Sequence, residues 1–237
     1  MAAQMTFQRY ELKYLLNPTQ KRAVLQAMDG HMDQYGRVTI RNIYYDTENF
    51  RLIRRSLERP CYKEKLRVRS YRQVSPEEPV FVELTKKYKS VVYKRRLSLP
   101  EGLVRQSLGQ DTPLPVSSQI GHEIAYFRSY YHPLIPTVFL SYQREAFYAV
   151  DGGDFRVTFD DHILYRQDQL SLCSEVYGAP ILSPGQTLME IKTSGGIPLW
   201  MVHALTQHNI FKTSFSKYGT AYQHMTKQQQ LGGLRYA

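Results

Sequence analysis

The segment 63–71, KEKLRVRSY, places cations two positions apart. Residues two apart in a β-strand point to the same side, so one face of this strand would carry Lys63, Lys65, Arg67 and Arg69. The opposite face would carry Leu66 and Val68, which suits packing against an apolar layer. Arg clamps phosphate oxygens in pairs, and Lys acts as a mobile point charge. The segment therefore predicts a strand with one apolar face and one face that binds anionic groups.

Period-two patterns recur along the chain and predict strands at residues 7–15, 38–46, 62–73, 79–87, 91–99, 137–150, 155–161 and 187–193. Parity gathers many cations on one face of these strands: Lys13, Lys65, Arg67, Arg69, Lys87, Lys94, Arg96, Arg144, Arg156 and Lys192. The same face holds few carboxylates: Glu11, Glu83, Asp160 and Glu190. Half-exposed strands whose polar faces only meet water are one explanation. The imbalance favours another, because such an excess of positive charge repels itself unless an anion is bound.

Capping signals predict helices between the strands. Asn17 and Pro18 mark one helix start, and Gly30 is its expected stop. The other predicted helices cover 117–131, 198–208 and a segment capped by Ser214 or Ser216. Loops are expected at 73–79, 100–117 and 178–187. These elements predict an α+β fold with enough strands to close a barrel, and if the strands do close, the charged face would be the lumen. The helices would cover the apolar outside of the barrel, in a single domain over residues 1–237.

Composition narrows the class of partner. The chain has 237 residues, a formal net charge of +10 and a pI near 9.5, which indicates a polyanionic partner. Nucleic acid is not expected, because the basic residues lack the aromatic rows that stack on bases.

Cys61 and Cys173 match neither a disulfide framework nor a zinc site. The N-terminus lacks the apolar core of a signal peptide, and no apolar run reaches the roughly 20 residues of a membrane span, so a cytoplasmic protein is expected.

Seven short motifs together resemble the VTC domain, the polyphosphate polymerase domain of the vacuolar transporter chaperone complex. They are Arg9-Tyr-Glu-Leu-Lys13, Tyr44-Tyr-Asp46, Lys65-Leu-Arg67-Val-Arg69, Val82-Glu-Leu-Thr-Lys-Lys87, Val92-Tyr-Lys-Arg-Arg96, Met189-Glu-Ile-Lys192 and Phe215-Ser-Lys-Tyr218. The resemblance runs in order from about residue 6 to residue 224. It implies a triphosphate tunnel metalloenzyme: an eight-stranded antiparallel tunnel whose basic side chains grip a triphosphate or a growing polyphosphate.

The resemblance also implies roles for individual residues. Phosphate contacts would come from Lys13, Arg67, Arg69, Lys94, Arg144, Arg156 and Lys217, and Lys87, Arg96 and Lys192 join them from the same charged face. Lys13, Arg67, Arg69 and Lys94 would act on the reacting phosphates as the catalytic set. Lys217 falls in the first turn of a predicted helix, where free backbone amides favour an anion. Glu190 would hold Mn²⁺ or Mg²⁺, and Glu11 and Glu83 are further candidates for that metal.

Two departures bear on the reaction. Hydrolytic members of the wider superfamily begin with Glu-x-Glu-x-Lys, whereas Arg9 stands at the first position here, and Thr85 stands where the polymerase domain usually has lysine. The expected reaction is transfer of the terminal phosphoryl group of a nucleoside triphosphate such as ATP to inorganic polyphosphate. A metal-dependent triphosphatase, with Glu11 or Glu83 orienting water, is one alternative. A noncatalytic polyphosphate-binding protein is another. The sequence is also compatible with a membrane protein as partner.

Overall fold

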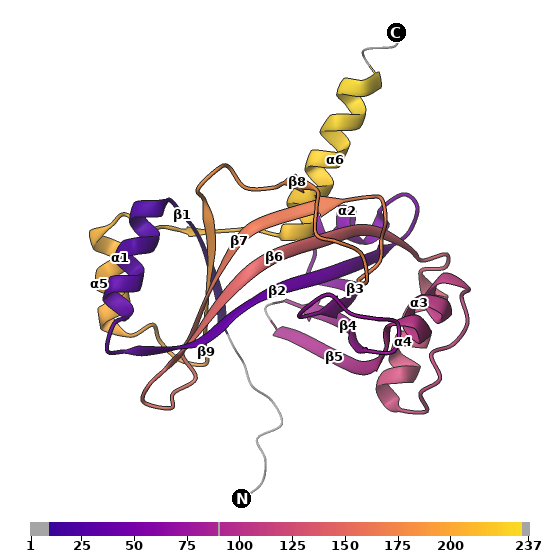
Figure 1. Ribbon diagram of the computed structural model, residues 1–237, viewed down its shortest axis with the longest axis horizontal. Helices are drawn as coiled ribbons and strands as arrows, with labels where there is room; N and C mark the ends of the chain where they lie inside the picture. The colour runs from indigo at the N-terminus through magenta and orange to yellow at the C-terminus, as the bar shows by residue number, and fades with distance from the viewer. Residues whose placement is uncertain (1–9, 90, 234–237) are drawn as a thin grey trace, which may run out of the picture. The chain divides into compact units, whose positions relative to one another are not determined.

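A computed structural model describes residues 10–89 and 91–233 (Figure 1). Arg9 and the first residues of the predicted strand 7–15 lie outside this range. The described strands are β1 (Tyr10–Leu16), β2 (Met32–Asp46), β3 (Tyr62–Ser70), β4 (Pro79–Tyr88), β5 (Val91–Pro100), β6 (Ile135–Ala149), β7 (Arg156–Arg166), β8 (Ala179–Pro180), β9 (Thr187–Thr193) and β10 (Lys212–Thr213). The described helices are α1 (Pro18–Met28), α2 (Arg51–Leu57), α3 (Glu101–Gly109), α4 (Gln119–Tyr130), α5 (Leu199–Gln207) and α6 (Lys217–Gly233).

The strands form one large sheet in the order β10-β1-β9-β7-β6-β2-β3-β4-β5, and β8 pairs with β7. The neighbouring strands whose register is defined pair antiparallel. The α+β class and the large antiparallel sheet are therefore confirmed. Among the described residues, hydrogen bonds do not join β10 to β5, so the predicted closed eight-stranded barrel is not confirmed.

The chain falls into two compact units. Unit 1 comprises Met1–Thr39, Tyr142–Ile163 and Leu182–Phe215, and unit 2 comprises Ile40–Ser141, Leu164–Ile181 and Ser216–Ala237. Each unit has its own cluster of buried apolar side chains. The strands β2, β6 and β7 contribute residues to both units, and the prediction of a single domain over residues 1–237 stays a prediction.

In unit 1, α1 begins where the sequence predicts. The Asn17 side chain accepts a hydrogen bond from the Gln20 backbone N–H, and the Gln20 side chain accepts one from the Asn17 backbone N–H. This capping box satisfies two amides that have no partner inside the helix. The helix ends at Met28, just before Gly30, whose φ of 72° lies in the left-handed region. Val24 and Met28 then join the buried cluster that includes residues of α5.

In unit 2, alternation along the strands separates two faces. Leu66 and Val68 of β3 and Val82 and Leu84 of β4 are buried in one apolar cluster, which also includes side chains of α3 and α4. The residues between them belong to the opposite face, which carries the cations. The helices of this unit therefore cover the apolar side of these strands, as the sequence predicts.

Two helices differ from the sequence prediction. The predicted loop 100–117 is wrong over α3, because Val104 and Leu108, four residues apart, are buried together and hold one helical face on the sheet. Helix α2 is missing from the prediction, because its N-cap residue, Phe50, supplies no side-chain cap. The other helices are confirmed, with Ser118 capping α4, Pro198 preceding α5, and the Ser216 hydroxyl accepting from the Gly219 amide in α6. Within residues 10–89 and 91–233, no helix combines the length and the apolar character that crossing a membrane requires.

Candidate functional site

The cationic face of unit 2 is built on β3, β4 and β5. Its charged residues, here called the Glu83 cluster, are Lys65, Arg67, Arg69, Glu83, Lys87, Lys94 and Arg96. Glu83 lies directly opposite Arg67 on one side and Arg96 on the other. Directly opposite residues of antiparallel strands project to the same face. The register therefore confirms that these residues lie on one face, as the alternation along each strand predicts.

Glu83 is the centre of this cluster. The residue is only 7% exposed, and its Oε2 accepts a hydrogen bond from Arg67 Nε at 2.6 Å. Arg96 Nε donates to Oε1 at 2.9 Å, and Arg96 Nη2 also reaches Oε1. Arg69 Nε lies 3.8 Å from Oε2. One buried carboxylate thus holds three guanidinium groups.

The charge balance of the Glu83 cluster is strongly positive, with six cations for one carboxylate. Burial disfavours the ionised form of Glu83, but Arg67 and Arg69, together with hydrogen bonds from Arg67 and Arg96, outweigh burial and lower its pKa to about 2. The carboxylate is therefore ionised throughout the physiological range, and it neutralises only part of the positive charge around it. The remaining charge favours an anionic ligand.

The other face of the same strands has a different arrangement. Lys86 Nζ and Arg95 Nε both contact the Glu123 carboxylate of α4, at 3.2 Å each. Lys86 therefore lies on the face opposite the Glu83 cluster and pairs with Glu123. Thr85 itself lies between Lys65 and Lys94 in the register of β3, β4 and β5, and it is buried.

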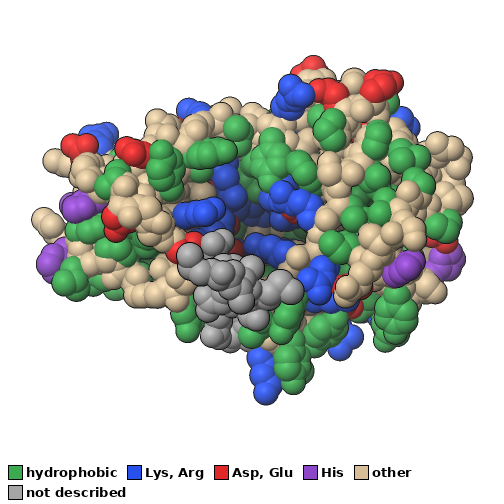
Figure 2. All heavy atoms as spheres, turned by 90° about the horizontal axis from the view of Figure 1, so that it is seen from below, with side chains coloured by type: hydrophobic (Ala, Val, Ile, Leu, Met, Phe, Trp, Pro, Cys, Tyr) green, Lys and Arg blue, Asp and Glu red, His purple; other side chains and the backbone are tan. Residues whose placement is uncertain are grey.

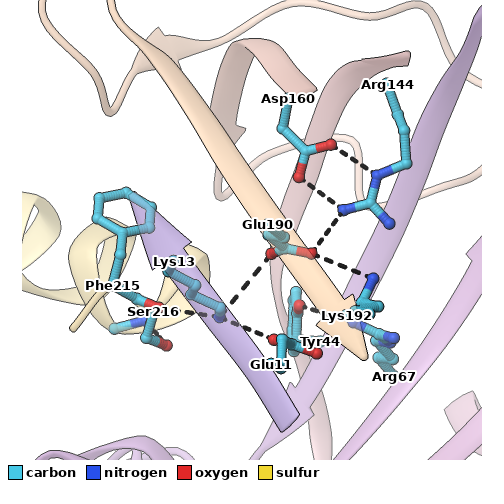
Figure 3. Close-up of polar contacts among 11 residues, drawn as sticks. Glu11, Lys13, Tyr44, Arg67, Arg144, Asp160, Glu190, Lys192, Phe215 and Ser216 are labelled. Carbon is cyan, nitrogen blue, oxygen red and sulfur yellow. Dashed lines mark hydrogen bonds and ion pairs between the residues drawn. The ribbon is translucent and has the colours of Figure 1, made fainter. Parts of the chain in front are cut away.

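A second charged group lies in unit 1. It is called here the Glu190 cluster and consists of Glu11, Lys13, Arg144, Arg156, Asp160, Glu190 and Lys192. Glu190 is 5% exposed and lies directly opposite Lys13 of β1. Its Oε1 is 3.8 Å from Lys13 Nζ, and its Oε2 is 3.4 Å from Lys192 Nζ and 3.1 Å from Arg144 Nη2 (Figure 3). Cations from three strands thus surround this carboxylate.

Arg144 of β6 is fixed by two carboxylates. Its Nε and Nη2 donate to the two oxygens of Asp160, both at 2.6 Å, in a bidentate pair (Figure 3). Burial disfavours the charged guanidinium, but Tyr142, Asp160 and Glu190 outweigh it, so the pKa of Arg144 lies well above its ordinary value. Arg144 is therefore a permanent cation of fixed orientation beside Glu190.

The remaining members of the predicted site have various surroundings. Lys13 Nζ is 3.2 Å from Glu11 Oε1 and donates to the Phe215 carbonyl at 3.0 Å. Arg156 is exposed and lies opposite Lys192 in the register of β7 and β9. In unit 2, Lys217 is half-buried and is the first residue of α6. Its position in the first turn of a helix agrees with the prediction.

The fit of a metal is decided by the oxygen donors. No group of three or more His, Cys, Asp or Glu side chains is placed to hold a metal ion anywhere in the described part of the chain. Glu11 and Glu190 both contact Lys13, so unit 1 offers two carboxylates near one cation. Mg²⁺ is commonly held by one or two carboxylates together with the phosphates of a substrate. Glu190 and Glu11 are therefore the carboxylates of unit 1 that could hold a metal, and only together with the phosphates of a substrate.

Tyr44 and Asn42 are not among the predicted site residues, yet both contact the Glu83 cluster. Arg67 Nη1 donates to the Tyr44 hydroxyl at 3.3 Å, and Arg69 Nε donates to Asn42 Oδ1 at 2.9 Å. Both acceptors come from β2, where Asn42, Tyr44 and Asp46 alternate on one face. That alternation of polar groups is the signal that identifies them.

The positive charge is also visible at the surface. Figure 2 shows Lys and Arg side chains exposed on one face of the molecule. This is consistent with a formal net charge of +10. Lys65 and Lys94 of the Glu83 cluster are themselves exposed.

Comparison of folds finds solved structures of similar architecture. A candidate adenylate cyclase from Bacillus halodurans is 16% identical, with a TM-score of 0.53, and the match covers 88% of this chain and 95% of that one. A candidate adenylyl cyclase from Hippeastrum, described as having a dominant triphosphatase activity, is 13% identical, with a TM-score of 0.52 and coverage of 88% and 92%. At such low identity these matches show a shared fold only. No match was found among curated proteins.

The sequence itself gives the more specific result. The model of one protein family, the VTC domain, matches residues 8–226. That span contains every predicted site residue, including those of the Glu83 and Glu190 clusters. It confirms the resemblance drawn from the seven motifs. The chain therefore belongs to the VTC domain family.

Proposed function

We propose that this protein transfers the terminal phosphoryl group of a nucleoside triphosphate, such as ATP, to a growing inorganic polyphosphate chain. The observation that carries the proposal is the Glu83 cluster, in which six cations share one face with one buried carboxylate. A polyanion neutralises that excess along its length, as a single carboxylate does not. Membership in the VTC domain family supports the same substrate class. A closed tunnel around the polymer is part of this proposal.

The state of the carboxylates favours transfer over hydrolysis. A hydrolase needs a base near the attacking water. Glu83 has a pKa of about 2, because Arg67 and Arg69 outweigh its burial, and so it is a poor proton acceptor. Glu190 is in contact with Arg144, Lys13 and Lys192. Phosphoryl transfer to a phosphate chain needs no such base, since the attacking oxygen is already ionised.

The residues then divide by the way they hold phosphate. Arg67, Arg69, Arg144 and Arg156 would clamp phosphate oxygens, because the planar guanidinium binds them in pairs. Lys13, Lys87, Lys94, Lys192 and Lys217 would neutralise charge along the chain. Lys13 and Lys94, with the first two arginines, would align the attacking and leaving oxygens. Alignment and charge neutralisation account for most of the rate in phosphoryl transfer, so no covalent protein intermediate is required.

Mn²⁺ or Mg²⁺ would be held by Glu190 with Glu11, and the phosphates would provide the other oxygens. When bound, such a metal neutralises and polarises the transferring phosphoryl group. Glu83 stays a further candidate for the metal, since its two oxygens accept hydrogen bonds from arginines much as Glu190 accepts from Arg144 and Lys192. The identity of the metal and of the nucleotide base, the cytoplasmic location and a membrane-protein partner stay predictions.

A triphosphatase is the second candidate, and one observation favours it. The Glu11 side chain is 39% exposed and lies 3.2 Å from Lys13, so a carboxylate is available to orient water beside a predicted phosphate contact. The shared fold with a protein described as having a dominant triphosphatase activity is compatible with this reading. A polyphosphate-binding protein without turnover is the third candidate.

Product analysis separates these functions. The purified protein is incubated with ATP and Mn²⁺, and long-chain polyphosphate, ADP and free phosphate are quantified separately. The proposal expects polymer together with ADP, lost in Arg67→Ala and kept in Arg95→Ala. Arg95 is a matched control, because it lies on β5 and faces Glu123 instead of the Glu83 cluster. Free phosphate without polymer would mean a hydrolase, and absence of turnover would mean a binding protein.

A further inference from the structure

Arg67 is held by side chains from two neighbouring strands. Its Nε donates to Glu83 of β4 at 2.6 Å, and its Nη1 donates to the Tyr44 hydroxyl of β2 at 3.3 Å. A guanidinium binds phosphate well only when its plane is oriented toward the ligand. Glu83 and Tyr44 together set that plane (Figure 3 shows the contact with Tyr44). Tyr44 is 4% exposed, so water has little access to its hydroxyl and does not readily replace the hydrogen bond from Arg67.

Tyr44 is fixed in turn by the start of α6. Its ring stacks on the ring of Tyr218, with centroids 4.6 Å apart and planes 18° from parallel. The Tyr218 hydroxyl donates to Asp46 Oδ2 at 3.0 Å and lies 3.1 Å from Thr137 Oγ1. Thr137 Oγ1 also donates to the Tyr44 carbonyl at 3.0 Å. Tyr218 directly follows Lys217, the first residue of the helix.

We propose that Tyr44 is a positioning residue of the anion site: its hydroxyl orients the Arg67 guanidinium, and its stacked ring ties that guanidinium to Tyr218 at the start of α6. The inference rests on the proposed role of Arg67 in phosphate binding. It links two predicted phosphate contacts, because Lys217 and Tyr218 are consecutive residues. Loss of the Tyr44 hydroxyl leaves the ring stack and the Glu83 contact in place but removes the hydrogen bond that holds Nη1 of the guanidinium.

The same contact with Arg67 also changes the electrostatics of Tyr44. Burial disfavours its ionised form, but Arg67, Lys65 and Arg69 of β3 outweigh burial and lower the pKa of Tyr44 to about 8. Its ring stacks on the neutral side chain of Tyr218 from α6, and its backbone carbonyl accepts from the Thr137 hydroxyl of β6. An anion bound to Arg67 cancels part of the positive potential, so the pKa of Tyr44 rises when the site is filled.

The test measures binding of inorganic tripolyphosphate without nucleotide, so that it is separate from any polymerase activity. Tyr44→Phe removes the hydroxyl and keeps the ring, and it is expected to bind tripolyphosphate about tenfold more weakly than the unaltered protein. Tyr165→Phe is the matched control, because Tyr165 is also buried but its hydroxyl has no hydrogen-bond partner among the described residues. It is expected to bind like the unaltered protein.

A second readout needs no variant that affects folding. Tyrosinate absorbance of the unaltered protein is titrated between about pH 6 and pH 11, a range that spans the ordinary tyrosine value. A component near pH 8 is expected to move upward when tripolyphosphate is added, to be absent in Tyr44→Phe and to remain in Tyr165→Phe.

Two results would overturn the inference. In one, Tyr44→Phe binds as tightly as the unaltered protein while Arg67→Ala binds weakly, which would leave Arg67 as a ligand that Tyr44 does not position. In the other, Arg67→Ala has no effect on binding, which would remove the anion site from this face. A protein that makes no polymer but shows both expected effects would contradict the polymerase proposal alone.

Discussion

Arg67 and Glu83 face each other across β3 and β4, with Arg67 Nε 2.6 Å from Glu83 Oε2. The same carboxylate also accepts from Arg96 and lies near Arg69. A single anion therefore keeps three guanidinium groups together on one face. Its removal should change both the stability of the empty protein and its affinity for phosphates.

Replacement of Glu83 by Gln tests this role. The pKa of about 2, against an ordinary 4.5, corresponds to about 3 kcal/mol, so the variant should lose up to about that free energy of unfolding at neutral pH. Urea unfolding measures the loss. Gln keeps a side-chain oxygen that accepts from Arg67 Nε, so the guanidinium stays oriented, and the variant has one more net positive charge in the cluster. It should therefore bind tripolyphosphate more tightly than the unaltered protein. Weaker binding by a folded variant would contradict the electrostatic account.

The stability difference between these two proteins should depend on pH. Because the pKa of Glu83 is lowered on folding, its contribution is fully present above about pH 4.5 and is lost as the pH falls through about 2. The two proteins should therefore differ by a constant amount near neutrality and converge in acid. Thermal unfolding at a series of pH values measures this. A gap that stays unchanged down to pH 2 would mean that Glu83 acts by packing rather than by charge.

Removal of an arginine should affect the affinity of the protein for tripolyphosphate differently on the two faces of the sheet. Arg67→Ala is expected to weaken binding by about thirtyfold at low ionic strength, since a hydrogen bond to a charged group contributes about 2 kcal/mol. Arg95→Ala removes the same charge from the face that meets Glu123 and should change affinity by less than about twofold. Isothermal titration calorimetry compares them. Equal losses would indicate that net charge, and not the face, determines binding.

Thr85 offers a gain-of-charge test. It lies between Lys65 and Lys94 in register, so Thr85→Lys would place three ammonium groups in one row. Repulsion should lower the melting temperature of the empty protein, and added tripolyphosphate should restore it by more than it stabilises the unaltered protein. Differential scanning fluorimetry with and without tripolyphosphate measures both effects. The account fails here if the ligand stabilises the two proteins equally.

Asp46 should contribute to the stability of the fold rather than to anion binding. It is fully buried, and its oxygens accept from the backbone N–H groups of Leu52 and Ile53 at 2.8 and 3.0 Å, where α2 begins. Asp46→Ala leaves these amides unsatisfied and should cost about 3 kcal/mol, against about 1 kcal/mol for the exposed cap variant Asn17→Ala. Chemical denaturation of both variants makes the comparison. Similar losses would show that burial adds nothing to the cap of α2.

The predictable parts of the fold are those encoded by neighbouring residues. Asn17, Pro18 and Gln20 form a complete helix start within four positions, so α1 follows from the sequence alone. Helix α2 does not, because its first turn is capped by Asp46, which lies outside the helix and before its N-cap residue Phe50. A cap contributed by the end of a preceding strand leaves no local pattern at the helix itself.

The candidate site divides in the same way. Parity is sufficient to assign Arg67, Glu83 and Arg96 to one face, because alternation is a property of each strand. The pairing of Arg144 with Asp160 and Glu190 is not predictable in this way, because it depends on which strands become neighbours. For the same reason Tyr44 could be read as a structural residue until its contact with Arg67 was known.

The most direct test of the central claim is the ratio of phosphate incorporated into polymer to ADP released, measured with ATP labelled on its terminal phosphate and Mn²⁺. A polymerase built on the Glu83 cluster predicts a ratio near one in the unaltered protein and in Arg95→Ala, with both products lost in Arg67→Ala. A ratio near zero, with the label recovered as free phosphate, would contradict the account and identify a hydrolase.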